Sequence, residues 1–323
     1  SRGTPSEMEG RLSGHAEPTE LHLEVAPGTT AGLQLEHVAP WRQRLVRGGV
    51  PVIWTRTEAW LQGFWMLAEP LASSPGVLPP FKAAEARARA RDPGRWLHAI
   101  RAALLSTSHG PLRAGRWRLR WVPPNVAGDA SERQRRSFTR ALREAFAPPG
   151  PRLEHFSLIV EELRCVVLRR PSSPDAPRVK AWRKHARAGS LPPVVLWELA
   201  TLDGYVVLDG HDRACAALAE GVDPPIVVLE QWAEDRRFRH ERIAWRAKAT
   251  ERYLWLSDTV GELMSTPSWR AATSHLVEAH RAAERSITTA AWRPAHYEAW
   301  RTEVEARVTP EHPGREGFFA ADE

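Results

Sequence analysis

The segment Val206–Leu218 constrains the fold more than any other part of the chain, because it joins three local signals in thirteen residues. Its sequence is Val-Val-Leu-Asp-Gly-His-Asp-Arg-Ala-Cys-Ala-Ala-Leu. An apolar strand runs into a turn at Gly210 and then into the first turn of a helix. The backbone N–H groups of a helix N-terminus are unpaired and carry partial positive charge, so phosphate is their natural ligand. Arg213 adds a fork of donors, and the segment therefore predicts an anion site.

The composition is that of a folded protein that needs no disulfides. The chain has 323 residues, 42% of them hydrophobic, which is enough for more than one domain with a proper core. Its two cysteines, Cys165 and Cys215, match no metal-binding or redox spacing. The N-terminus is polar and no window reaches the roughly 18 apolar residues of a membrane span. We expect a cytoplasmic protein with no membrane association.

Charge and tryptophan content each leave two interpretations open. The formal charge of +6 favours a nucleic-acid partner, but only four of the 45 basic residues are Lys, which is more typical of GC-rich coding than of a nucleic-acid surface. The fifteen Trp residues are interpreted as core and interface packing, with stacking on nucleobases as the alternative.

The pattern along the chain predicts an α+β protein with several segments. We expect a disordered tail over 1–20, an N-terminal α+β region over 21–150, a small mixed-sheet domain over 151–232, a helical region over 233–309 and a frayed tail over 310–323. The run Ala147-Pro148-Pro149-Gly150-Pro151 is the predicted domain boundary.

In the N-terminal region, residues 21–25 and 33–38 alternate apolar with polar residues across a Pro27-Gly28 turn, which predicts an antiparallel pair of strands. A strand is also expected at 50–54, whereas 59–67 is ambiguous between helix and strand. Two helices should meet at Asp92-Pro93-Gly94. The strand expected at 117–122 has a basic outer face, either solvated or contacting nucleic acid.

A capping box at Ser131-Glu132-Arg133-Gln134 and apolar residues at helical spacing predict a helix from 132 to about 147. Its polar face carries several arginines. This face is either simply solvated or a contact for a nucleic-acid or protein partner through Arg133, Arg136 and Arg140.

From residue 152 to 232 strands and helices alternate. The expected elements are a strand at 164–168, a helix capped by Asp175 with Pro177 in its first turn and Gly189 after its end, strands at 193–199 and 205–208, a helix at 211–220 closed by Gly221, and a strand at 226–229. Helices at 234–256, 266–283 and 294–308 should follow.

The stretch 164–230 resembles the ParB/sulfiredoxin-like superfamily. The residues that carry the resemblance are the helix around Arg178, the Gly189-to-Leu196 entry into a strand, and Asp209-Gly210-His211-Asp212-Arg213 followed by Ala216-Ala217-Leu218. The resemblance covers about a fifth of the chain. It implies a small sheet with a G-x-x-R turn that binds nucleotide phosphates.

The resemblance also implies roles for single residues. Gly210 matches the turn glycine, Arg213 the phosphate-binding arginine, and Asp209 the aspartate of the version found in the free-serine-kinase branch, where it suits metal binding or deprotonation of a hydroxyl. His211 stands where the sulfiredoxin branch has its catalytic cysteine, so thiol repair is not expected, and Cys215 should face the packing side. Asp212 replaces the usual histidine and adds negative charge beside the pocket. Asp175 is the one acidic substitute for the kinase branch's loop glutamate.

Two functions follow. The first is a phosphotransferase or nucleotide hydrolase that uses ATP or CTP with Mg²⁺, with Asp209, His211 and Asp175 as catalytic residues, Asp209 as the metal ligand, and the stretch 210–213 holding the nucleotide. The alternative is a non-catalytic module that binds a nucleotide, a phosphorylated small molecule, a protein or a nucleic acid. A purely structural turn, with Asp209 or Asp212 capping the helix, accounts for the same residues.

Overall fold

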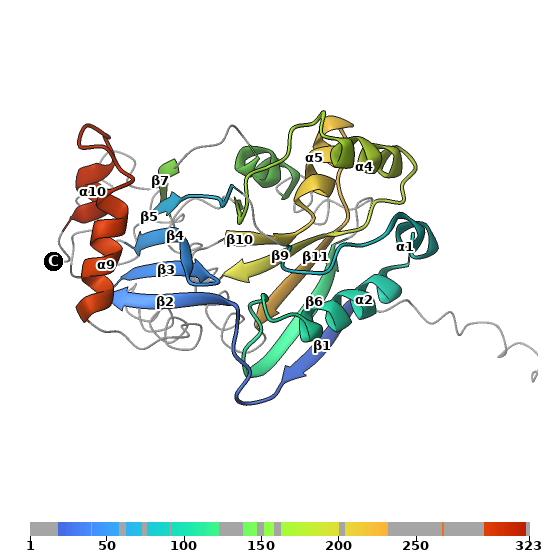
Figure 1. The fold of residues 1–323 in the computed structure, drawn as a ribbon, viewed down its shortest axis with the longest axis horizontal. Helices are drawn as coiled ribbons and strands as arrows, with labels where there is room; N and C mark the ends of the chain where they lie inside the picture. The colour runs from blue at the N-terminus through green and yellow to red at the C-terminus, as the bar shows by residue number, and fades with distance from the viewer. Residues whose placement is uncertain are drawn as a thin grey trace, which may run out of the picture.

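The computed structural model describes residues 19–39, 41–57, 63–72, 76–90, 92–122, 138–146, 152–157, 163–199, 204–231, 267 and 294–320. These residues form two β-sheets with helices on the outer face of each, as Figure 1 shows. The α+β class expected from the sequence is therefore confirmed.

Sheet A is mixed and has six strands in the order β1-β6-β11-β9-β10-β8. The strands are β1 (Glu20–Val25), β6 (Gly115–Val122), β8 (Arg164–Val167), β9 (Val194–Leu199), β10 (Gly204–Asp209) and β11 (Ile226–Gln231). Two pairs are parallel, β8 with β10 and β9 with β11, and the remaining pairs are antiparallel.

Sheet B has five strands in the order β2-β3-β4-β5-β7 and is antiparallel throughout. The strands are β2 (Leu33–Ala39), β3 (Arg42–Arg47), β4 (Val50–Thr57), β5 (Gly63–Ala68) and β7 (Arg152–Ser157). The ambiguous segment around 59–67 is thus a strand from residue 63 onward.

Six named helices accompany the sheets: α1 (Ala83–Ala88), α2 (Pro93–Ser106), α4 (Pro177–Arg187), α5 (His211–Ala219), α9 (Pro294–Glu305) and α10 (Arg315–Phe319). Residues 138–145 are also helical. The stop-and-restart signal is confirmed: Asp92 ends the connection after α1 and caps α2 by accepting a hydrogen bond from the Arg95 N–H at 2.8 Å.

The alternation of side chains along the strands produces a layered core. Ile53 of β4 lies in a large apolar cluster that takes residues from both sheets, while its neighbour Trp54 lies in a second cluster against α9 and α10. In the same way, Val206 faces the shared cluster and Val207 packs on the α5 side. Neighbouring residues of a strand point to opposite faces, so β4 of sheet B and β10 of sheet A bury side chains on both faces.

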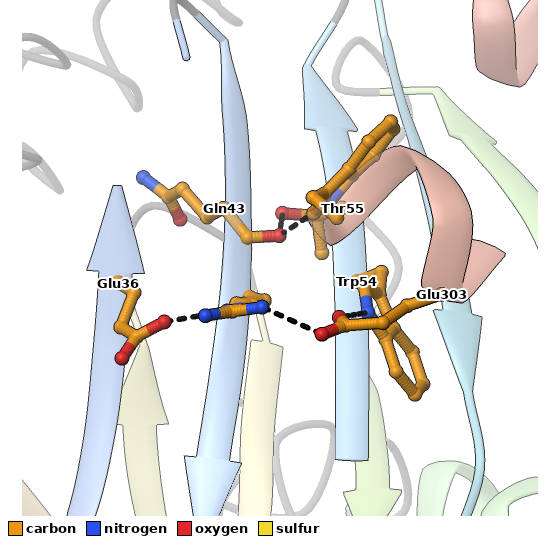
Figure 2. Close-up of polar contacts among 7 residues, drawn as sticks. Glu36, Gln43, Trp54, Thr55 and Glu303 are labelled. Atoms are coloured by element: carbon orange, nitrogen blue, oxygen red, sulfur yellow. Dashed lines mark hydrogen bonds and ion pairs between the residues drawn. The ribbon is translucent and has the colours of Figure 1, made fainter. Parts of the chain in front are cut away.

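The helices α9 and α10 cover the outer face of sheet B, at the end of the molecule opposite α4 and α5 (Figure 1). Glu303 of α9 accepts hydrogen bonds from Arg44 at 2.7 Å and from the Trp54 indole at 2.6 Å, as Figure 2 shows for the tryptophan. Trp300 is fully buried and donates to the Gln43 carbonyl at 3.2 Å. The C-terminal segment is therefore held by both apolar packing and polar contacts.

Two expectations for the termini are wrong. Residues 21–25 and 33–38 are strands, but they do not pair with each other, because β1 pairs with β6 and β2 with β3. The register of β1 places Glu20 opposite Arg120 and Glu24 opposite Arg116, so β1 finds a complementary charge pattern on β6. Residues 310–320 are not frayed: they contain α10, whose Phe318 is fully buried.

Both sheets take strands from both sides of the boundary expected near residue 150. Strand β6 pairs with β11 in sheet A, and β5 pairs with β7 in sheet B. Residues 21–122 and 152–231 thus build the same two sheets. The boundary run itself, the first part of the 132–147 helix and residues 1–18 of the expected tail lie outside the described residues. So do the helix expected at 234–256 and, apart from residue 267, the one expected at 266–283.

Candidate functional site

The site predicted around Gly210 is a tight strand-to-helix turn, as expected. Gly210 is the N-cap of α5 and has φ of +94°, a left-handed conformation that favours glycine. A Cβ at this position would lie 2.8 Å from Arg213 Nη2 and 3.1 Å from the Val194 Cα. Only glycine therefore fits between the end of β10, the start of α5 and β9.

No side chain of the described residues caps α5, so the interpretation of Asp209 or Asp212 as a cap is wrong. The first backbone hydrogen bond of the helix runs from the Ala214 N–H to the Gly210 carbonyl at 2.8 Å. The N–H groups of residues 211–213 precede it and concentrate the positive end of the helix dipole at the turn.

Arg213 folds back over this turn and contacts Asp209. Its Nη2 donates a hydrogen bond to Asp209 Oδ2 at 2.6 Å, and the Phe81 ring covers the guanidinium at 5.2 Å. The Arg213 residue is 4% exposed, and its Nε has no hydrogen-bond partner among the described residues. The arginine expected to meet phosphate thus meets a carboxylate of the chain itself, and the corner is closed by Phe81.

Asp212 is held by a different set of donors. Its Oδ1 accepts hydrogen bonds from Arg169 Nη2 at 2.9 Å and from the Ser172 hydroxyl at 2.7 Å, and Oδ2 lies 3.1 Å from Arg178 Nε. Burial raises the pKa of this carboxyl, but the Ser172 hydrogen bond and the charge of Arg169 outweigh burial, so the Asp212 pKa lies below its usual value. The carboxylate is charged and well satisfied.

His211 is buried at 3% exposure, and its Nε2 has no hydrogen-bond partner within the described part of the chain. Burial, and next the charge of Arg169, lower the pKa of His211 to about 3. The imidazole is therefore neutral at pH 7. A buried imidazole with a pKa this low is a weak base and is poorly placed to remove a proton from a substrate.

A further arginine reaches this region from sheet B. Arg47, at the end of β3, is 7% exposed, and burial together with the charge of Arg169 lowers its pKa. Arg47, Arg169 and Arg213 all influence His211 electrostatically. Guanidinium groups from β3, the end of β8, α4 and α5 thus gather around the first turn of α5.

Asp175 does not join this cluster. Its side chain is 82% exposed and lies 3.3 Å from Lys180 Nζ. The N-cap of α4 is Ala176, not Asp175, although Pro177 is the first helical residue as expected. The side chain from this loop that contacts the site is that of Ser172.

Sequence reasoning missed four contributors, Arg47, Phe81, Arg169 and Ser172. Each comes from an element that is remote in sequence from the turn, and none lies in a motif of its own. The only sequence signal for Arg169 and Ser172 was weak: two arginines at 169–170 follow a strand directly before a loop that contains two serines.

The two other basic surfaces expected from the sequence lie on β6 and on the helix at 138–145. The basic face of β6 is paired with acidic residues, since Arg118 contacts Glu230 of β11 at 2.6 Å and Glu20 of β1 at 3.2 Å. On the helix at 138–145, Arg140 lies 3.6 Å from Glu144. Arg133 and Arg136 lie outside the described residues.

The cysteines are not placed for chemistry. Cys215 packs in an apolar cluster with Ala216 and Ala217, as expected, and burial raises its pKa to about 11. Burial also raises the pKa of Cys165. Within the described ranges, no three His, Cys, Asp or Glu side chains gather as a metal-binding group.

Comparisons with known proteins place the chain in no family. No protein-family model matches it, and neither a curated protein nor a solved structure matches it. No helix within the described residues is long and apolar enough to cross a membrane.

Proposed function

We propose that the protein binds the phosphate group of a nucleotide or another phosphorylated small molecule at the first turn of α5. The observation that carries this proposal is the gathering of arginines around a helix start that no described side chain caps. Arg169 and Arg178 contact Asp212, and Arg213 contacts Asp209, so three guanidinium groups lie at this turn. Guanidinium forks and helix N–H groups are the donors that recognise phosphate.

The geometry favours a binding module over a phosphotransferase or hydrolase. In the described residues, Asp209 is committed to Arg213, and Asp175 is exposed beside Lys180. His211 is buried and neutral. A catalytic base needs an available acceptor within reach of the proton that it removes. These three residues, the catalytic candidates from the sequence, do not meet that requirement together.

The ParB/sulfiredoxin-like resemblance is part of this proposal. Of the residues that carry the resemblance, Arg178 lies on α4, Val194 begins β9, and Asp209–Arg213 form the turn from β10 to α5. In that setting ATP and CTP are the ligands to test first, with and without Mg²⁺.

The test is a thermal-shift and calorimetric titration of the full chain with ATP, CTP and pyrophosphate. A ligand at about 100 times its Kd adds roughly 2.7 kcal/mol to the free energy of unfolding. Arg178→Ala should weaken binding by about tenfold, since it removes a charged donor beside Asp212. Its side chain is 61% exposed, so the fold should persist.

Lys180→Ala is the matched control, because Lys180 lies on the same helix and contacts Asp175. It removes the same charge and should leave affinity unchanged. The proposal is wrong if none of the three ligands binds, or if Arg178→Ala and Lys180→Ala bind as tightly as the original chain.

A further inference from the structure

On the basis of the anion site proposed above, we propose that Asp209 acts as an internal competitor for the ligand. Its carboxylate holds the Arg213 guanidinium where a phosphate oxygen would bind. Binding of a phosphate must then break the Asp209–Arg213 ion pair, so the protein's own carboxylate sets the affinity of the site.

The geometry of the pair supports this competition. Asp209 Oδ2 and Arg213 Nη2 are 2.6 Å apart, and the pair spans the turn from the last residue of β10 to the third residue of α5. The guanidinium Nη2 and Nε lie 2.8 and 3.1 Å from the position that a Gly210 Cβ would occupy. The guanidinium therefore covers the turn at which the helix N–H groups emerge.

The contacts of Arg213 are incomplete in this closed arrangement. Its Nε is buried and has no partner among the described residues, although a buried donor without a partner is costly. A carboxylate uses one of its oxygens here, whereas a phosphate presents several oxygens to Nη2, Nε and the N–H groups together. A phosphate thus satisfies donors that Asp209 leaves unsatisfied.

The neighbouring carboxylate is a useful contrast. Asp212 receives a hydroxyl and two guanidinium groups, Ser172, Arg169 and Arg178. Because both of its carboxylate oxygens have partners, Asp212 stays in place when a ligand binds. Among the described residues, Asp209 has one side-chain hydrogen-bond partner, Arg213, so it is the carboxylate that a ligand displaces most easily.

The experiment compares Asp209→Asn with the original chain by calorimetric titration with pyrophosphate, first without Mg²⁺. The variant keeps the size of the side chain but loses the charge that competes for Arg213. We expect its affinity for pyrophosphate to rise about tenfold. Asp209→Ser is a second neutral variant in case the asparagine does not fold.

Asp175→Asn is the control, because it removes the same charge from an exposed side chain that contacts Lys180. It should leave the affinity unchanged, which separates competition at Arg213 from a general change in net charge. Competition is overturned if the original chain binds pyrophosphate and Asp209→Asn binds it equally or more weakly. It is also overturned if binding in the original chain requires Mg²⁺ and Asp209→Asn abolishes it, which makes Asp209 a metal ligand.

The two proposals fail in distinguishable ways. If pyrophosphate binds neither the original chain nor the Asp209→Asn and Asp175→Asn variants, the proposed anion site is wrong. If ATP or CTP binds the original chain and pyrophosphate binds only when Asp209 is neutralised, both proposals are supported.

Discussion

At the scale of single residues, the turn at Gly210 is governed by pairing between a few charged groups in a buried place. Asp209 forms an ion pair with Arg213, and Asp212 forms ion pairs with Arg169 and Arg178. Breaking one member out of such a pair leaves its partner buried and uncompensated, which is far more costly than losing a surface ion pair. The arrangement therefore stabilises the first turn of α5 in the absence of a ligand.

His211 gives this region a pH dependence that can be measured. Its pKa falls from the usual 6.5 to about 3 in the folded protein, because burial, Arg169, Arg47 and Arg213 outweigh Asp212. A lowered pKa means that the unfolded chain binds the proton first, so the stabilisation is complete above pH 6.5 and is lost as pH falls toward 3. We expect about 2 kcal/mol of lost stability at pH 5.

The measurement is urea unfolding at pH 7 and pH 5 for the original chain and for His211→Leu. The variant should lose less stability between the two pH values, because it no longer takes up this proton on unfolding. Equal losses in both proteins would show that His211 titrates normally in the folded state.

At the scale of elements, α9 is attached to sheet B by a cluster in which polar and apolar contacts alternate. Arg44 of β3 donates hydrogen bonds to Glu36 of β2 and to Glu303 of α9. Glu303 also accepts a hydrogen bond from the Trp54 indole of β4 (Figure 2). Burial lowers the pKa of Arg44, but the bond to Glu36 and the charge of Glu303 outweigh burial and raise it above its usual value. Helix α9 is thus bonded directly to β3 and β4, and to β2 through Arg44.

Glu303→Gln should lower the free energy of unfolding by about 1 to 3 kcal/mol, since it weakens two hydrogen bonds in a mostly buried setting. The matched control on the same helix is Glu305→Gln, whose ion pair with Arg301 is exposed and should change stability by no more than about 0.5 kcal/mol. Chemical denaturation of both variants measures the difference. Equal effects would mean that the Glu303 contacts do not attach α9.

The local sequence pattern predicted most of the described helices and strands but not which strands pair with each other. Strand alternation located β1, β2, β4 and β6, and turn signals placed Gly189 and Gly221, both with positive φ, at the ends of α4 and α5. The sequence did not reveal β3, because Arg42-Gln43-Arg44 looks polar although Arg42 and Gln43 are buried and Arg44 is partly buried. Pairing between β1 and β6 depends on residues almost a hundred positions apart.

The site was predictable only where it is contiguous in sequence. Gly210 and Arg213 lie within four residues, so their roles in a turn could be inferred. The pairing of Arg213 with Asp209 could not be distinguished from a phosphate contact, because the same donor serves both acceptors. Phe81 and Ser172 reach the turn only through the tertiary fold.

At the scale of the whole molecule, the two sheets form one structure around a shared core. Strands from residues 20–122 and from 152–231 join side by side in both sheets, β6 with β11 in sheet A and β5 with β7 in sheet B, and the core cluster contains side chains from both parts. Arg47 at the end of β3 in sheet B acts electrostatically on His211 in the first turn of α5, which follows β10 of sheet A. The proposed anion site therefore depends on the packing of the two sheets.

The most direct test of the central claim is to follow the backbone amide resonances of His211, Asp212 and Arg213 by NMR while pyrophosphate is added. These N–H groups precede the first hydrogen bond of α5, so a bound phosphate must perturb them. We predict saturable shifts at these three amides, with smaller changes at residues remote from the turn. Unchanged resonances for 211–213 at pyrophosphate concentrations that perturb other parts of the chain would contradict the account.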